Sequence, residues 1–233
     1  FYECPIQELY LGDGIEVIPE NCFSQSQIET LIIPDSVKKI GMNAFSWCFE
    51  LKTIHFGENV EVIDVCAFDY CREVEKLTFN KKLQTIGKAA FRECEKLKKV
   101  EFGGSEKVLD EEAFRGCTQL ETMILTDGLQ TIGAQSLDCG TKFRMLWIPA
   151  SVSYLGENSV SAGTVWFESD VLPQNTAENW QNGCQSVEMG CGKLMQWNDF
   201  IYRKRDNKAI IVSYLGNETE LTVDKVDGMG IAD

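Results

Sequence analysis

Apolar and polar positions recur along the first two thirds of the chain with a period of 22 or 23 residues. A small residue followed by a large apolar residue, here called the marker, stands once in each period. The markers at a spacing of 23 are Phe45, Phe68, Phe91, Phe114, Leu137 and Val160, and Phe23 and Phe1 precede them at spacings of 22. Such a period indicates a repeat protein, whose units bury their apolar sides only by stacking on one another.

Each period contains two short stretches with the pattern of β-strands. In the first, such as LKTIHFGE from Leu51, apolar and polar residues alternate, which is typical of a strand with one buried face. A turn follows, then a shorter apolar pair such as Val60 and Ile63, and then the marker segment, which we expect to form one helical or 3₁₀ turn. The pattern predicts a mainly β solenoid with parallel strands and short helical turns. Its predicted inward rows are Ile28, Leu51, Val74, Leu97 and Leu120, and Phe45, Phe68, Phe91 and Phe114.

The unit Leu-x-x-Ile-x-Phe-x-x-x-Val-x-x-Ile-x-x-x-Ala-Phe-x-x-Cys resembles the BspA-like class of leucine-rich repeats over residues 1 to about 170. That family consists mostly of surface or secreted proteins of bacteria, with relatives in some parasitic protists. The resemblance implies an extracellular or cell-surface protein that serves adhesion or protein binding and not catalysis. Two departures matter. Glu106 takes the place of an apolar residue, so the fifth unit should be irregular, and residues 161–170 compress the register, so the array should degenerate there.

The pattern divides the chain into three parts. Residues 1–170 are predicted to form a leucine-rich-repeat solenoid of about seven units of 22–23 residues, and the polar residues 171–192 a cap or linker. Residues 193–233 hold three short β-like runs, 200–202, 209–214 and 221–223, with turns at Asp206–Asn207 and Gly216–Asn217. They predict a small β module, which resembles the start of a further repeat array in the same family. Residues 217–219 match the glycosylation acceptor pattern, which often arises by chance.

Ten cysteines raise the question of disulfides or zinc. Five of them stand three residues after a marker and form a predicted ladder: Cys4, Cys48, Cys71, Cys94 and Cys117. A thiol at one inward position per unit behaves as a small apolar side chain, so we expect a reduced and buried ladder, with disulfides between adjacent units as the alternative. Cys22 is expected in the core. The cysteines off the ladder are Cys66, Cys139, Cys184 and Cys191, and whether Cys184 and Cys191 pair stays open.

Charge and composition narrow the possible functions. The chain carries 36 acidic and 22 basic residues, a net charge of −14 that repels phosphate backbones, so we expect no nucleic-acid partner. No apolar run approaches the ~18 residues of a membrane span, so we expect no membrane insertion. The first residues also lack the basic start and apolar core of a signal peptide.

The residues also offer little for catalysis. His55 is the single histidine, and the sequence has no Cys-x-x-Cys pair, phosphate-binding loop or nucleophile motif. We therefore expect no enzyme, no cofactor and no metal site. A glycosidase pair of carboxylates is the one catalytic arrangement that the sequence leaves open, because their separation in space is not given by the sequence.

The outward row of the predicted strand face is the candidate binding surface. It consists of Tyr10, Ile32, His55, Thr78, Glu101, Ile124, Trp147 and Trp166. Tryptophan and arginine often anchor interfaces. The candidate ligand-binding residues are therefore Trp147, Trp166, Arg144, Met145, Tyr10 and Ile32. We expect them to hold a protein or glycan ligand, such as one on a host surface or matrix, unless the C-terminal cap covers the tryptophans. The alternative function is a structural spacer within a longer surface protein.

Overall fold

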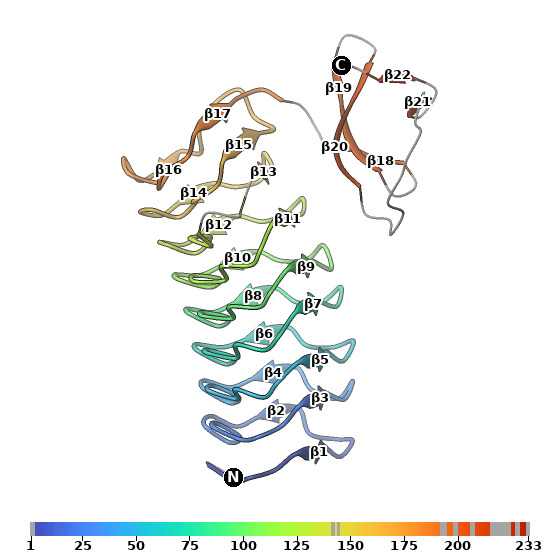
Figure 1. Ribbon diagram of the computed structural model, residues 1–233, viewed down its shortest axis with the longest axis vertical. Helices are drawn as coiled ribbons and strands as arrows, with labels where there is room; N and C mark the ends of the chain where they lie inside the picture. The colour runs from blue at the N-terminus through green and yellow to red at the C-terminus, as the bar shows by residue number, and fades with distance from the viewer. Residues whose placement is uncertain are drawn as a thin grey trace.

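The computed structural model describes residues 3–140, 143 and 145–191, and the backbone of residues 195–197, 200–205, 208–214, 225–226 and 229–231. Residues up to 191 wind into a solenoid whose turns stack in chain order along the long axis (Figure 1). Strands and turns make up these described residues, and none of them is helical. The predicted parallel-strand solenoid is confirmed.

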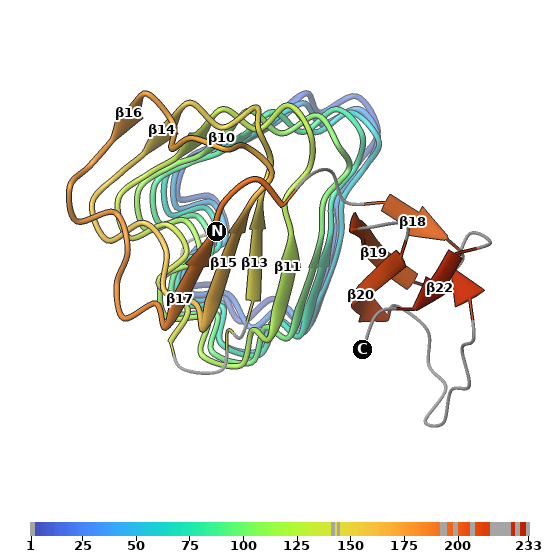
Figure 2. The same cartoon turned by 90° about the horizontal axis from the view of Figure 1, so that it is seen from above.

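Each turn contributes a strand of three or four residues to one side and a two-residue strand to another. The first set, here called the strand face, is β1 (Glu8–Tyr10), β3 (Thr30–Ile32), β5 (Thr53–His55), β7 (Lys76–Thr78), β9 (Lys99–Glu101), β11 (Thr122–Ile124), β13 (Met145–Ile148), β15 (Thr164–Phe167) and β17 (Ser186–Glu188). The second set is β2 (Val17–Ile18), β4 (Lys39–Ile40), β6 (Val62–Ile63), β8 (Thr85–Ile86), β10 (Val108–Leu109), β12 (Thr131–Ile132), β14 (Tyr154–Leu155) and β16 (Asn175–Thr176). Figure 2, which looks along the stack, shows the two sets on different sides of the core.

The marker phenylalanines stack along the solenoid. Neighbouring rings from Phe23 to Phe114 lie 5.3–5.5 Å apart between centroids and within 11° of parallel. The fully buried residues include both predicted inward rows: Phe45, Phe68, Phe91, Phe114, Ile28, Leu51, Val74, Leu97 and Leu120. Side chains at one position of successive turns therefore form a continuous core.

The marker segments are turns, where we expected a helical turn. Asn43 and Trp47 flank the marker Phe45 with φ angles of 53° and 62°, in the left-handed region that a right-handed helix does not use. The N–H groups of Asn43, Phe45 and Trp47 donate to carbonyl oxygens of the next turn at 2.7–3.0 Å. Because these donors bond between turns, the segment closes no helical hydrogen-bond ladder.

The solenoid continues where we expected it to degenerate. β15 pairs with β13 in register, with Val165 opposite Leu146, because the shortening falls in the connection after the marker Val160. β16 and β17 then add a further turn, so residues 171–191 extend the parallel stack of the solenoid. All three residues of β17 are exposed, which explains why its turn lacks the hydrophobic pattern of the others.

Glu106 makes the fifth unit irregular only in the loop between β9 and β10. Its side chain is 1% exposed, and its carboxylate accepts hydrogen bonds from the N–H groups of Gly103 at 2.8 Å and Gly104 at 2.9 Å. The Thr126 hydroxyl donates a third bond at 3.1 Å. A buried carboxylate needs such donors. β10 still pairs in parallel register with β8 and β12, so the strand pairing at this unit is the same as in the other units.

The thiol ladder is longer than predicted. The thiols of Cys48, Cys71, Cys94 and Cys117 are buried and reduced, and each Sγ lies 3.2–3.5 Å from the carbonyl oxygen of a marker in the preceding turn. Cys139 makes the same contact to Phe114 at 3.4 Å, although it stands only two residues after its marker. Cys184 approaches Val160 at 3.7 Å from the turn that was not predicted.

The remaining cysteine expectations have mixed outcomes. Cys184 is a free thiol, so no disulfide joins it to Cys191. Cys4, placed on the ladder by its spacing, and Cys22, expected in the core, are only half-buried.

Residues after 191 form a five-stranded sheet in the order β18-β19-β20-β22-β21. Its strands are β18 (Met195–Trp197), β19 (Phe200–Arg205), β20 (Lys208–Tyr214), β21 (Lys225–Val226) and β22 (Met229–Ile231). The predicted runs at 200–202 and 209–214 lie within β19 and β20. The predicted turns at 206–207 and 216–217, the run at 221–223 and the acceptor pattern at 217–219 lie outside the described residues. In the described part of the chain, no helix is long and apolar enough to cross a membrane.

Candidate functional site

The N-terminal end of the strand face is open to solvent and partly apolar. Tyr10, Ile32 and His55 of β1, β3 and β5 stand opposite one another in the parallel register. Tyr10 is 84% exposed and Ile32 is 56% exposed, and His55 is exposed as well. An open hollow of about 370 Å³ beside Tyr10 and Ile32 is also lined by Glu8 and Glu29. This end therefore presents apolar side chains with an acidic rim.

The middle of the strand face carries a compact charged group. The Glu101 carboxylate lies 2.9 Å from the ammonium groups of both Lys76 and Lys99. The Thr78 hydroxyl donates to it at 2.9 Å. Desolvation raises the pKa of Glu101, but the hydrogen bonds from Lys99, Lys76 and Thr78 outweigh it and lower this pKa to about 2. A polar block therefore separates the two ends of the strand face.

Toward the C-terminal end of the strand face, the outward side chains of β13 and β15 are less exposed than those at the N-terminal end. Trp147 pairs in register with Trp166, but Trp147 is only 4% exposed and Trp166 is half-buried. Their rings meet edge to face, with centroids 6.1 Å apart and planes at 84°. Of the two alternatives for Trp147, an exposed or a covered ring, the structure therefore shows a buried ring. Met145 is half-buried, and Arg144 lies outside the described residues.

The burial of Trp147 agrees with the alternative that the tryptophans are not available to a ligand. The segment that we expected to cover them does not do so as a separate cap. The segment expected to cover the rings, residues 171–191, forms the next solenoid turn. The sheet of β18–β22 lies on the strand-face side of the solenoid (Figure 2). Alternation along a strand predicts which side chains point outward, but it carries no information about what lies over them.

A second group of exposed rings lies on the marker turns and was not predicted from the sequence. Trp47 stacks on Tyr70 of the next turn, with centroids 4.4 Å apart and planes at 14°. Phe49 meets Trp47 edge to face at 5.8 Å and 82°. The guanidinium carbon of Arg72 lies 5.5 Å from the ring centroid of Phe49 and 5.4 Å from that of Tyr70. We call Trp47, Phe49, Tyr70 and Arg72 the aromatic ridge.

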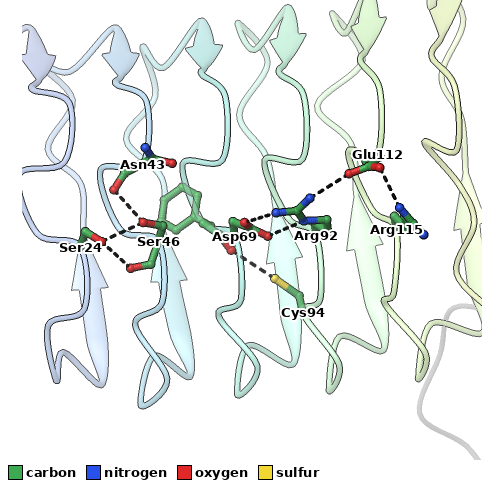
Figure 3. Close-up of polar contacts among 9 residues, drawn as sticks. Ser24, Asn43, Ser46, Asp69, Arg92, Cys94, Glu112 and Arg115 are labelled. Atoms are coloured by element: carbon green, nitrogen blue, oxygen red, sulfur yellow. Dashed lines mark hydrogen bonds and ion pairs between the residues drawn. The ribbon is translucent and has the colours of Figure 1, made fainter.

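A row of ion pairs lies next to the ridge and consists of Asp69, Arg92, Glu112 and Arg115 (Figure 3). Arg92 donates to Asp69 from Nε at 3.0 Å and from Nη2 at 2.7 Å, and to Glu112 from Nη1 at 2.9 Å. Its guanidinium carbon lies 5.7 Å from the Tyr70 ring centroid. Arg115 donates to Glu112 at 2.7 Å. Charge-assisted bonds with this fork geometry hold both partners in one orientation.

The pKa values of the two carboxylates reflect their surroundings. The Asp69 carboxylate is only 4% exposed, and burial raises its pKa despite the opposing effect of Arg92. Glu112 is less buried, so the hydrogen bonds from Arg92 and Arg115 overcome desolvation and lower its pKa. Both carboxylates therefore have arginine hydrogen-bond partners within this row.

The ridge had a weak signal in the sequence. Its rings stand at the second and fourth positions after the marker, where other units carry polar residues such as Gln25, Glu93 and Glu95. A search for positions that recur does not detect residues that depart from the repeat in two units only. The aromatic residues that replace the usual ones in these two units are the only indication of the ridge in the sequence.

The described residues include no group of three or more His, Cys, Asp or Glu side chains that could hold a metal ion. Among the described residues, the exposed strand face and the aromatic ridge are two features that offer contact to other molecules.

The repeated turn with its Ala-Phe marker and parallel strand face matches a known family. The BspA type leucine-rich repeat region matches residues 1–108 and 38–166, in six copies. The chain belongs to the BspA-type leucine-rich repeat family. The BspA-type match ends at residue 166, whereas the array extends through β17.

The comparison with solved structures found other leucine-rich repeat proteins, of which the first described here has a similar fold. A leucine-rich repeat protein from Eubacterium ventriosum has a TM-score of 0.52 and 21% identity over 56% of this BspA-type chain and 36% of its own. A leucine-rich cell surface protein from Faecalibacterium prausnitzii has a TM-score of 0.46 and 24% identity, covering 68% and 52%. The pneumococcal vaccine antigen PcpA has a TM-score of 0.37 and 19% identity, covering 77% and 59%. This chain spans about a third of the first of these proteins and about half of the second. The comparison with curated proteins gave no match.

Proposed function

We propose that this BspA-type array is a non-catalytic binding module at the bacterial cell surface and that it holds a protein or glycan ligand on its strand face. The observation that carries the proposal is the exposure of Tyr10 and Ile32, which stand side by side on a parallel sheet. Side chains as exposed as these contribute little to the packing of the solenoid, so their apolar surface is available to a partner.

The contact would centre on Tyr10 and Ile32, with Glu8 and Glu29 at its rim. Trp166 and Met145 are half-buried and would add a smaller contact at the far end, while the buried Trp147 supports Trp166. Apolar contacts of this kind depend weakly on salt. The net charge of −14 would steer basic partners toward the module, an effect that fades above about 0.15 M salt.

A double variant, Tyr10→Ala with Ile32→Ala, tests the proposal. Its folding is checked by circular dichroism, and binding is measured on a panel of immobilised matrix proteins and on a glycan array. We expect at least about tenfold weaker binding to any ligand that the native chain holds. The matched control, Tyr154→Ala with Val171→Ala, removes exposed apolar side chains elsewhere and should bind normally. An unchanged affinity of the Tyr10 and Ile32 variant would contradict the proposed position of the site.

A structural spacer is the second candidate function, and the ion pairs that join successive turns favour it. Lysine and glutamate side chains about one repeat apart pair at 2.6–3.0 Å: Lys52 with Glu29, Lys96 with Glu73, and Lys98 with Glu75. Each exposed pair contributes little by itself, but the pairs add to the stacked core in joining successive turns. A spacer would show no saturable binding to any protein of the panel or to any glycan of the glycan array, and this result would distinguish it from a binding module.

A further inference from the structure

We propose that the aromatic ridge is a second binding surface and that it takes the apolar face of a neutral sugar ring in a glycan. The ridge lies on the marker turns that lead from the second set of strands to the strand face. Its ligand would therefore not occupy the strand face, and each surface can fail its test without affecting the other.

The ridge exposes rings at positions where the fold does not need them. Other turns carry polar or small residues there, such as Gln25, Glu93 and Gly116, so the solenoid packs without aromatic side chains at the second and fourth positions after the marker. Trp47 and Phe49 nevertheless remain 43% and 42% exposed. Their rings stand at 82° to each other and so form an apolar corner. The C–H groups on one face of a pyranose pack against rings of this kind, while its hydroxyl groups remain free to bond to polar neighbours.

The ridge is held in place before any ligand arrives. The Tyr70 ring is in contact with Trp47 and with the guanidinium groups of Arg72 and Arg92. Arg92 in turn is fixed by its two bonds to the buried Asp69 carboxylate. A preorganised surface loses little conformational entropy on binding, which matters for a weakly binding ligand such as a sugar.

The charges around the ridge favour a neutral ligand. Arg72 lies over the rings of Phe49 and Tyr70 and Arg92 over that of Tyr70, and these two positive charges would repel a cationic ligand. Arg72 is also paired with Glu95 at 3.1 Å, and Arg92 with two carboxylates, so neither guanidinium is reserved for an anion. The net charge of −14 opposes an anionic ligand further.

The backbone of the ridge disfavours an extended peptide. The N–H groups of Trp47 and Tyr70 donate to the next turn at 2.7 Å and 2.8 Å, and those of Phe49 and Arg72 donate within their own turns at 3.0 Å. A peptide that adds as a strand needs such donors. Recognition at the ridge must therefore use side chains, and ring faces with neighbouring polar groups suit a sugar.

Titration with neutral and acidic sugars tests the proposal. The probes are cellohexaose, maltohexaose and mannohexaose, with polygalacturonate as the acidic comparison. Binding is measured by calorimetry and by the shift of the Trp47 indole N–H resonance, which a Trp47→Phe variant assigns. We expect at least one neutral probe to bind with saturation and to move this resonance. We expect Trp47→Ala and Phe49→Ala each to weaken that binding at least about tenfold, and Trp47→Phe to weaken it less.

Two controls keep the test decisive. Tyr154→Ala removes an equally exposed ring elsewhere, and the Tyr10→Ala, Ile32→Ala variant removes the strand-face contact; both should bind the sugar normally. If Trp47→Ala proves unstable, Phe49→Ala decides the outcome, because Phe49 is exposed and lies at the edge of the ridge. The proposal is overturned if no neutral probe binds, if polygalacturonate binds more tightly, or if the well-folded Phe49 variant binds as the native chain does.

Discussion

At the scale of single residues, the ladder cysteines combine small apolar bulk with suppressed reactivity. Burial raises the pKa of Cys48 to about 11 and those of Cys71, Cys94 and Cys117 well above the ordinary value of 9.0. The thiolate is the reactive form of cysteine, so these side chains should behave as inert core residues. Each Sγ also lies close to a marker carbonyl, which satisfies a polar atom that the core would otherwise isolate.

Alkylation with iodoacetamide, mapped by mass spectrometry, should therefore divide the cysteines into two groups. In the native protein we expect no labelling of Cys48, Cys71, Cys94, Cys117 and Cys139, whereas the half-buried Cys4 and Cys22 react first and serve as internal controls. After unfolding without reductant, all of them should react. A ladder cysteine that stays unlabelled in denaturant would be disulfide-bonded, and this would contradict the reduced ladder.

The residues that could be predicted from the sequence are those that recur. Phe91 and Leu97 occupy positions fixed by the repeat, and both are fully buried. Trp147 was predicted to point outward, but it is only 4% exposed, and the repeat does not specify its edge-to-face contact with Trp166. Trp47 and Phe49 replace the usual residues in one turn only, and their arrangement as a ridge depends on Tyr70 in the next turn. Periodicity thus predicts the core, while the candidate sites arise from departures that become interpretable only in space.

At the scale of elements, each strand of the strand face is too short to be stable alone and depends on its neighbours. β7 and β9 show how outward side chains add to this pairing. Lys76, Thr78 and Lys99 all contact Glu101, so one carboxylate links the two strands on the solvent side. Cross-strand pairs of opposite charge stabilise a sheet modestly.

Because of this carboxylate, the stability of the pairing between β7 and β9 should depend on pH in the acidic range. The pKa of Glu101 is about 2 in the folded chain against an ordinary value of 4.5. Its contribution to stability is therefore complete above pH 4.5 and is lost as the pH falls toward 2. Because Glu101 is partly exposed, we expect this contribution to stay below about 1 kcal/mol.

A carbon-detected NMR titration of the glutamate side chains measures this pKa directly. We expect the Glu101 carboxyl to titrate with a midpoint near 2, and a Lys76→Met, Lys99→Met variant to move the midpoint back toward 4.5. A Lys52→Met variant, which removes an ion pair of Glu29 elsewhere, should leave Glu101 unchanged and serves as the control. A native midpoint near 4.5 would show that the two lysines do not hold the carboxylate in solution.

At the scale of the whole molecule, the solenoid has no centre: every turn packs mainly on the turn before and the turn after it. The parallel strand pairs of the solenoid join neighbouring turns, as do the stacked phenylalanine rings. In such an array the stability of the whole is close to a sum of contributions from single turns and from the interfaces between them. A defect in one turn should therefore weaken its neighbours more than distant turns.

Phe91→Ala introduces such a defect in the middle of the array. Phe91 is fully buried between Phe68 and Phe114, so its removal leaves a cavity and should cost about 3–5 kcal/mol in denaturant unfolding. Amide hydrogen exchange should then accelerate most in β7, β9 and β11 and progressively less toward β3 and β15, because local opening follows local stability. Tyr154→Ala, at an exposed position, is the control and should change neither measurement. A loss below about 1 kcal/mol would contradict the packing assigned to the marker row. Equal acceleration in every turn would instead show that the array opens as a single unit, so that the turns are coupled more strongly than nearest-neighbour packing allows.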